Sequence, residues 1–168
     1  NVIADPGRIK STTKIIARVS IINDTRWKLK NNQRVHLHIG TTEVVAKAII
    51  SDGPITKGQS GNVLFILEKE VAAIMDQRFI IRSFSPMETI GGCVVLDINP
   101  IPTKKELRKW INNLKLNPSS RFKQFVSFFW KNPKSKARWE NYFQTNESEI
   151  DKWIIKQEIK HQNELVFN

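Results

Sequence analysis

The sequence is poor in cysteine, in acidic side chains and in long apolar runs, and each shortage narrows the range of functions that the chain could have. Cys93 is the single cysteine among 168 residues, which excludes an internal disulfide and a metal site built from several cysteines. No apolar run approaches the roughly 18 residues of a membrane-spanning helix, and no signal-peptide pattern opens the chain. The phosphate-binding patterns G-x-x-x-x-G-K-S/T and G-x-G-x-x-G are also absent. We therefore expect a cytoplasmic binding module rather than an enzyme, with no metal and no cofactor in this chain.

Basic residues outnumber acidic ones, most strongly in the last third of the chain. The sequence has 27 Lys and Arg against 16 Asp and Glu, a formal charge of +11. Residues 1–100 contain 13 basic and 9 acidic side chains, net +4, whereas residues 101–168 contain 14 and 7, net +7. Such a charge favours an acidic partner, with nucleic acid first and an anionic membrane second.

Apolar residues alternate with period two in residues 1–100. In RVHLHIG, Val35, Leu37 and Ile39 share one face of a strand, and Arg34 and the two histidines share the other. The similar segments are TKIIARVSII, EVVAKAII, GNVLFILE, RFIIRS and GCVVLDI. Six short strands separated by turn residues are typical of a small antiparallel barrel or sandwich. Closure would remove the exposed edges, so we predict an all-β, six-stranded antiparallel barrel for this first domain.

Residues 101–168 change to the 3.6-residue period of helices. The predicted helices are TKKELRKWINNLK, opened by Thr103 and Glu106 at capping-box spacing, SSRFKQFVSFFW, KARWENYF, and NESEIDKWIIKQ with Asn146 as its N-cap. The inward-facing residues are predicted to be Leu107, Trp110, Ile111, Leu114, Phe122, Phe125, Val126, Phe129, Trp139, Phe143, Ile150, Trp153 and Ile154. A hairpin turning at Gln162 and Asn163 follows. This order predicts a connector helix and then a mostly α winged helix-turn-helix domain.

Three residues could suggest chemistry. His36 and His38 point the same way on one strand, which would suit two metal ligands if a third were close. No motif supplies a third ligand, and two polar residues on the outer face of a barrel are the favoured interpretation. Cys93 lies among strand residues, where we expect a small buried side chain rather than a nucleophile.

A set of spaced motifs carries a family resemblance. DQRFIIRS, a loop containing Ser-Pro, and TIGGCVVLD resemble the end of the third domain of elongation factor Tu-class GTPases, with Cys93 in place of a third glycine. That family pattern is R-F-x-x-R, a loop, T-V/I-G-x-G and a final strand. Together with LHIGTTEVVAKAII and DPGRIKSTTKIIARVSII, residues 1 to about 100 are similar to bacterial selenocysteine-specific elongation factors. In that family winged-helix domains follow the barrel. The domain predicted for residues 101–168 is of the same type and has the same place in the chain.

The resemblance implies a part of a factor that delivers selenocysteyl-tRNA to the ribosome at recoded UGA codons, using GTP. GTP and Mg²⁺ are expected in a GTPase domain outside this sequence. The selenocysteine insertion hairpin of the mRNA is expected to bind further C-terminal modules, also outside it. Because the first residue is Asn1, we expect a fragment. The chain itself is expected to be non-catalytic, monomeric and not bound to a membrane.

The resemblance also implies tRNA-contacting residues in the barrel. Lys69 in LEKEVA matches a lysine that contacts the T-stem backbone in the relatives. Ser83 and Phe84 match the contact loop that follows Arg82, and His36 matches a polar T-stem contact. Such groups would bind phosphates and 2′-hydroxyls across the shallow A-form minor groove, which reads shape rather than base sequence.

Two of these assignments have alternatives. Arg82 could equally form a structural ion pair with Asp76 or Glu88, because apolar strand residues flank it. Lys69 could be a solvated surface side chain, and Glu70 beside it would place a negative charge near a phosphate.

The second domain has a basic cluster of its own. Lys131, Lys134, Lys136 and Arg138 lie between the second and third predicted helices, and we expect them to contact an RNA backbone without sequence preference. Trp130 and Trp139 flank this cluster. Helical spacing predicts that both tryptophans are core residues rather than base-stacking platforms.

Two other functions remain open from the sequence. A winged-helix transcriptional regulator with the barrel as a sensor or oligomerisation unit would need a base-reading helix. The fourth predicted helix instead begins with Glu147, Glu149 and Asp151, which would face DNA phosphates unfavourably. For the tail alone, a structural spacer is the other alternative.

Overall fold

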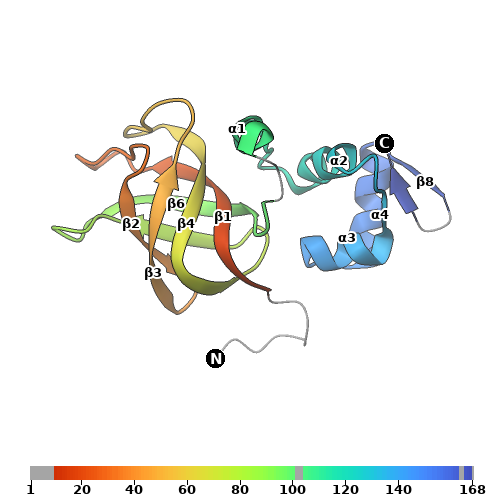
Figure 1. Cartoon of the computed structure of the whole chain (residues 1–168), viewed down its shortest axis with the longest axis horizontal. Helices are drawn as coiled ribbons and strands as arrows, with labels where there is room; N and C mark the ends of the chain where they lie inside the picture. The colour runs from red at the N-terminus through yellow and green to blue at the C-terminus, as the bar shows by residue number, and fades with distance from the viewer. Residues whose placement is uncertain (1–9, 101–103, 163–164, 168) are drawn as a thin grey trace. The chain divides into compact units, whose positions relative to one another are not determined.

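The computed structural model describes residues 10–100, 104–162 and 165–167 (Figure 1). They form two compact units, one from Lys10 to Asn113 and one that begins at Leu114. Across these described ranges, no helix combines the length and the hydrophobicity needed to cross a membrane.

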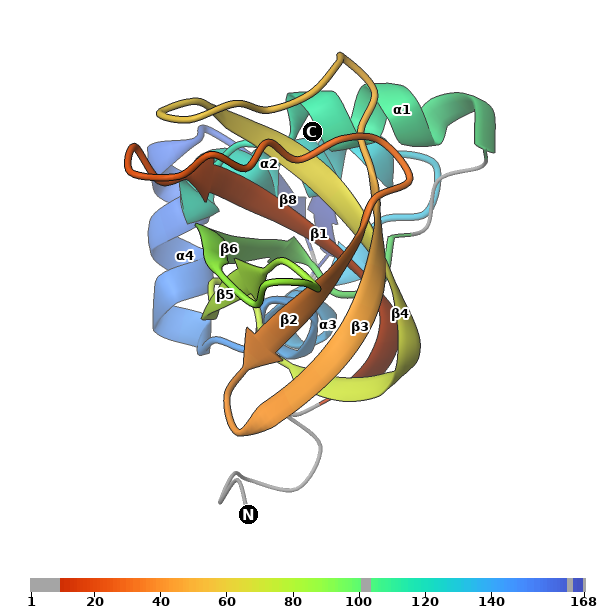
Figure 2. The ribbon, with the colours of Figure 1, turned by 90° about the vertical axis from the view of Figure 1, so that its left-hand side faces the viewer.

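The first unit is a closed barrel of antiparallel strands (Figure 2). The strands are β1 (Lys10–Ile21), β2 (Arg34–Ile39), β3 (Thr42–Ile49), β4 (Ser60–Ala73), β5 (Arg78–Arg82) and β6 (Thr89–Asp97). Their order around the barrel is β1-β4-β3-β2-β5-β6. All six predicted strands are confirmed, as is closure into a barrel. β4 is longer than its predicted segment GNVLFILE because it continues to Ala73.

Alternating side chains fill the barrel. Val35 and Leu37 of β2 are completely buried and Ile39 is nearly so, as their period predicts. Phe65 of β4 and Phe79 of β5 meet edge to face across the core, with ring centroids 6.0 Å apart. Burial of these apolar side chains is the main force that closes the barrel.

The glycine pair of TIGGC has two different environments in β6. A Cβ atom on Gly91 would lie 2.5 Å from the backbone oxygen of Ser20 in β1, so only glycine fits there. A Cβ atom on Gly92 would meet nothing within 4 Å. Cys93 lies opposite Val19 and Phe79 in regular strand pairing, without a positive φ angle. The third glycine of the family pattern is therefore not required by the backbone at this position.

The buried position of Cys93 predicts an unreactive thiol. Burial raises the pKa of the Cys93 thiol well above its ordinary value, so the thiolate fraction at neutral pH falls. We expect the folded protein to react with a disulfide reagent such as DTNB far more slowly than the same protein in guanidinium chloride. Equal rates in the two conditions would contradict the buried placement.

The helix α1 (Lys104–Asn113) belongs to the barrel unit. The Asn62 side chain of β4 donates a buried hydrogen bond of 2.7 Å to the backbone oxygen of Ile111. Arg108 donates to the backbone oxygen of Ser51 at 2.6 Å. The helix predicted as a connector is therefore attached to the barrel, and its predicted capping residue Thr103 lies outside the described residues.

The second unit contains three helices and a small sheet. Its elements are α2 (Pro118–Phe128), β7 (Lys134–Ser135), α3 (Lys136–Phe143), α4 (Glu147–Lys156), β8 (Lys160–Gln162) and β9 (Leu165–Phe167). The sheet order is β7-β9-β8, and this chain order is that of a winged helix-turn-helix domain. β7 was not predicted because two residues show no periodicity. Gln162 ends β8, and the other predicted turn residue, Asn163, lies outside the described residues.

Side-chain caps fix where these helices begin. Asn117, Ser135 and Asn146 precede α2, α3 and α4, and each side-chain oxygen accepts a hydrogen bond from a first-turn backbone N–H. Pro118 starts α2, where its missing N–H has no consequence. The predicted cap at Asn146 is confirmed.

An aromatic cluster forms the core of the second unit. Trp139 is completely buried, and its ring packs near those of Phe122 (5.6 Å), Phe129 (5.9 Å) and Phe143 (6.1 Å). The prediction that both tryptophans are core residues is confirmed for Trp139 and wrong for Trp130, which is 63% exposed. Trp130 lies beyond the end of α2, so the helical period no longer turns it inward.

Candidate nucleic-acid interface

Strand pairing brings three of the predicted barrel residues together. β2 pairs with β5 so that His36 lies opposite Arg82. Phe84 follows two residues later, and its ring lies 4.2 Å from the His36 ring, tilted by 46°. His36 is half-buried, whereas Phe84 is 42% exposed. The outer surface at β2 and β5 therefore presents a contacting His–Phe pair with an arginine beside it.

Arg34 completes this surface and was not among the predicted site residues. Its guanidinium carbon lies 5.4 Å from the centroid of the Phe84 ring, on the ring face. Arg34 also forms an ion pair with Glu68 of β4. The alternation of RVHLHIG had placed Arg34 on the same strand face as His36, and this shared face was the signal that could have identified Arg34 as a site residue.

Lys69 lies in an irregular part of β4. The β1–β4 register moves from Lys14 opposite Ile66 to Thr12 opposite Val71, so one residue of β1 faces four of β4, residues 67–70. Glu68, Lys69 and Glu70 are all exposed there. In a regular strand successive side chains point to opposite faces, so Lys69 would point into the barrel if Glu68 and Glu70 point outward. The irregularity therefore turns Lys69 outward.

His36 and Lys69 line one open hollow, which we call the His36–Lys69 hollow. Its volume is about 560 Å³. The residues around it are His36, Glu43, Val44, Val45, Glu68 and Lys69. Two predicted contact residues from β2 and β4 thus share one concavity, although 33 positions separate them in the sequence (69 − 36).

Carboxylates lie among the cations of this surface. Glu43 has an oxygen 2.7 Å from Nδ1 of His36 and 4.0 Å from Nε2 of His38. With Glu68 paired to Arg34, the surface has mixed charge, which favours directed hydrogen bonds over general attraction to polyanions. In the part of the chain that the structure describes, no group of three or more His, Cys, Asp and Glu side chains could hold a metal ion.

Arg82 and Glu88 bind different partners. Arg82 donates a hydrogen bond of 3.1 Å to the backbone oxygen of Met87. Glu88, which the sequence offered as an ion-pair partner for Arg82, instead pairs with Arg26 at 3.1 Å and accepts a hydrogen bond of 2.6 Å from the Trp27 indole. Arg82 thus braces the loop between β5 and β6.

Ser83 shapes the same loop from inside. It is 1% exposed, and its hydroxyl donates to the backbone oxygen of Pro86 at 2.6 Å. The Ser83 hydroxyl oxygen in turn accepts a hydrogen bond of 3.0 Å from the backbone N–H of Glu88. This closed set of bonds holds the loop that presents Phe84, so Ser83 acts on the surface by positioning its neighbour.

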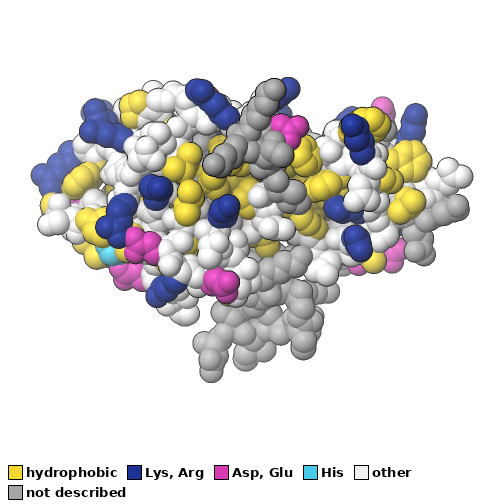
Figure 3. Space-filling view, viewed as in Figure 1, with side chains coloured by type: hydrophobic (Ala, Val, Ile, Leu, Met, Phe, Trp, Pro, Cys, Tyr) yellow, Lys and Arg dark blue, Asp and Glu magenta, His cyan; other side chains and the backbone are white. Residues whose placement is uncertain are grey.

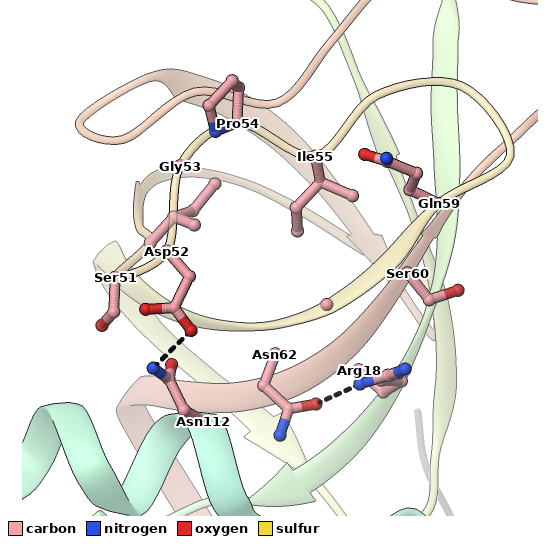
Figure 4. Close-up of a pocket in the computed structure, with 12 residues that line it drawn as sticks. Arg18, Ser51, Asp52, Gly53, Pro54, Ile55, Gln59, Ser60, Asn62 and Asn112 are labelled. Carbon is pink, nitrogen blue, oxygen red and sulfur yellow. Dashed lines mark hydrogen bonds between the residues drawn. The ribbon is translucent and has the colours of Figure 1, made fainter.

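A second hollow, of about 470 Å³, lies where the loop after β3 meets α1 (Figure 4). Its polar groups bind one another: Arg18 donates to Asn62 at 3.3 Å, and Asn112 donates to Asp52 at 2.7 Å. The first bond joins β1 to β4 and the second joins α1 to the loop after β3, so the polar groups of this hollow have structural roles.

The predicted basic cluster of the second unit lies around the end of α2. Lys131 Nζ is 5.3 Å from the Trp130 ring, and Lys134 Nζ is 4.3 Å from the Phe129 ring. Lys136 forms an ion pair of 2.6 Å with Asp151 of α4, so its charge is compensated. Arg138 is exposed on α3. Lys and Arg side chains outnumber acidic ones on the face of the molecule in Figure 3.

A comparison with known families matches residues 14–102, more than half of the chain, to the β-barrel domain of the selenocysteine-specific elongation factor. The chain belongs to this family. The match begins within β1 and continues past the end of β6, so it includes all the residues of the His36–Lys69 hollow.

A curated member of this family supports the assignment. The selenocysteine-specific elongation factor of Desulfomicrobium baculatum is 31% identical to the chain over 77 residues, which are 45% of this chain and 12% of that protein. The chain therefore spans about an eighth of the length of this relative.

Proposed function

We propose that the chain is the tRNA-contacting, non-catalytic part of a selenocysteine-specific elongation factor, with the barrel touching the T-stem backbone of selenocysteyl-tRNA. The observation that carries the proposal is the convergence of Arg34, His36, Phe84 and Lys69 on one outer surface of the barrel. These residues come from three separate segments of the chain. A merely solvated surface would not require the contacting His–Phe pair or the shared hollow.

The chemistry of this surface suits an A-form backbone. Lys69 and Arg34 supply positive charge for phosphates, and His36 supplies a ring nitrogen for a phosphate or a 2′-hydroxyl. Glu43 and Glu68 accept hydrogen bonds, so they can meet 2′-hydroxyl donors and repel a misplaced phosphate. Charges of both signs at set positions discriminate by shape, as a factor that selects one tRNA requires.

The rest of the delivery cycle is assigned to other parts of the protein. GTP and Mg²⁺ would bind a GTPase domain, and the mRNA hairpin would bind other C-terminal modules. The second unit of this chain would link the barrel to those modules and approach RNA through Lys131, Lys134, Lys136 and Arg138. Its α4 has Glu147 and Glu149 in the first turn, which disfavours the DNA-reading alternative. The factor would act on the ribosome in the cytoplasm, as a monomer.

The double variant Lys69→Ala/Phe84→Ala tests the barrel surface. We expect its Kd for selenocysteine tRNA to rise roughly tenfold, the loss of about 1.4 kcal/mol. The slope of log Kd against log salt should fall by roughly 0.9 for the one phosphate that Lys69 neutralises. Fluorescence anisotropy with labelled tRNA at several salt concentrations would measure both quantities.

Lys57→Ala is the matched control, because Lys57 is an exposed lysine of the same barrel outside the hollow. It should change neither the Kd nor the salt slope. Equal affinity of the double variant and the unmodified chain would contradict the proposal. Tighter binding to a DNA duplex of matched length than to tRNA would support the regulator alternative instead.

A further inference from the structure

Trp130 is a large apolar side chain in an exposed position. It is 63% exposed, in a turn just beyond α2, while Phe129 before it packs against Trp139 of the core. Single exposed apolar side chains are normal on protein surfaces, so the exposure of Trp130 becomes informative only together with the charges beside it. Trp130 is not explained by the packing of the second unit.

Lys131 lies beside this indole, in a segment rich in cations. Residues 129–139, FWKNPKSKARW, contain four basic side chains and no acidic one. Asp151 compensates Lys136, whereas no carboxylate among the described residues lies within ion-pair distance of Lys131, Lys134 or Arg138. Lys131 and Lys134 lie over the faces of Trp130 and Phe129. The surface thus combines an open aromatic face with uncompensated positive charge.

We propose that Trp130, Lys131 and Lys134 bind a segment of single-stranded RNA, with one unpaired base stacked on the indole and the two ammonium groups on the adjacent phosphates. Stacking on an exposed aromatic ring beside cations is the general mode of single-strand binding, because every base offers a π-face. The site extends the RNA role proposed above for the second unit and uses no residue of the barrel surface.

The position of Trp130 favours an unpaired strand over a duplex. A duplex is read by a helix or a ribbon that enters a groove, whereas Trp130 lies in a turn between α2 and β7. A side chain on a turn can reach a splayed base directly, whereas insertion into a duplex carries the free-energy cost of unstacking each base step. Uncompensated lysines also disfavour a neutral protein partner, which would have to desolvate them without a counter-charge.

A labelled oligouridine of roughly ten nucleotides, long enough for one such site, is the probe. Trp130→Ala should raise its Kd about tenfold, the loss expected for one stacked base, and Trp130→Phe should restore most of the affinity. Lys131→Gln/Lys134→Gln should reduce the salt slope by roughly 0.7 for each phosphate that is no longer neutralised. Ile155→Ala, which removes another exposed apolar side chain of the same unit (78% exposed), should change nothing.

Three results would overturn the inference. They are oligouridine affinity that is unchanged in Trp130→Ala, an equal loss in Ile155→Ala, and competition by polyglutamate as strong as by unlabelled oligouridine. Competition by polyglutamate would mean a site for acidic protein.

Two variants separate this site from the barrel surface. The double variant Lys69→Ala/Phe84→Ala should leave oligouridine binding intact, and Trp130→Ala should leave binding of an RNA hairpin that reproduces the T-stem (a T-stem minihelix) intact. If Trp130→Ala leaves oligouridine affinity unchanged while Lys69→Ala/Phe84→Ala weakens minihelix binding, this site is overturned and the barrel proposal stands. If Trp130→Ala weakens oligouridine binding while Lys69→Ala/Phe84→Ala leaves minihelix affinity unchanged, the barrel proposal is overturned and this site stands.

Discussion

Replacing Trp139 by alanine is expected to lower the free energy of unfolding of the second unit by about 3–5 kcal/mol. The side chain is completely buried and packs edge to face against Phe122, with ring centroids 5.6 Å apart. Its removal leaves a cavity among rings that cannot all collapse into it. Because small domains have a net stability of only about 5–15 kcal/mol, the helices of this unit should be largely unfolded at moderate denaturant concentrations. Circular dichroism at the helix band during denaturant titration would measure the change.

Trp130→Ala is the matched control for this experiment, since it removes the same side chain nine positions earlier (139 − 130). Trp130 is mostly exposed, so its replacement should alter stability by no more than about 0.5 kcal/mol. If both variants lost the same stability, the placement of Trp130 outside the core would be wrong.

Gly91→Ala is expected to destabilise the barrel by about 1–3 kcal/mol. The added Cβ would lie 2.5 Å from the backbone oxygen of Ser20, so β1 and β6 would have to separate where Gly91 pairs with Ile21. The clash is with backbone, which cannot rotate away as a flexible side chain can. Thermal unfolding monitored in the β-sheet region of the circular dichroism spectrum would measure the effect.

Gly92→Ala tests whether the effect of Gly91 is steric. No atom lies within 4 Å of the added Cβ, and the φ angle of Gly92 is one that alanine adopts. We expect unchanged stability, or a gain of about 0.4–1 kcal/mol from the more restricted unfolded chain. A loss equal to that of Gly91→Ala would point to a general requirement for glycine in this strand rather than a close approach at one position.

Much of the fold was predictable because it depends on local patterns. The alternation of Val35, Leu37 and Ile39 predicted β2, and five similar segments predicted the other strands. Asn146 predicted the beginning of α4. Apolar alternation and capping depend on residues that are close together in the sequence, so both can be recognised from one sequence alone.

The candidate site was predictable only in part, because its geometry depends on pairing between distant segments. The family resemblance named His36, Lys69 and Phe84, but the contact of Arg34 with Phe84 needs the β2–β5 pairing. The burial of Ser83 follows from a loop whose hydrogen bonds no periodicity shows. The exposure of Trp130 follows from the end of α2, a boundary that the apolar pattern placed two residues too late, at residue 130 instead of Phe128.

The attachment of α1 determines which piece of this chain can be moved as a module. The sequence changes character after Pro100, and a domain exchange made there would leave the Asn62 amide without its acceptor at Ile111. It would also leave Asp52 without Asn112 and the backbone oxygen of Ser51 without Arg108. The segment that can be transplanted as a unit is therefore the barrel together with α1, ending at Asn113. A chimaeric factor that borrows this barrel must take the helix with it.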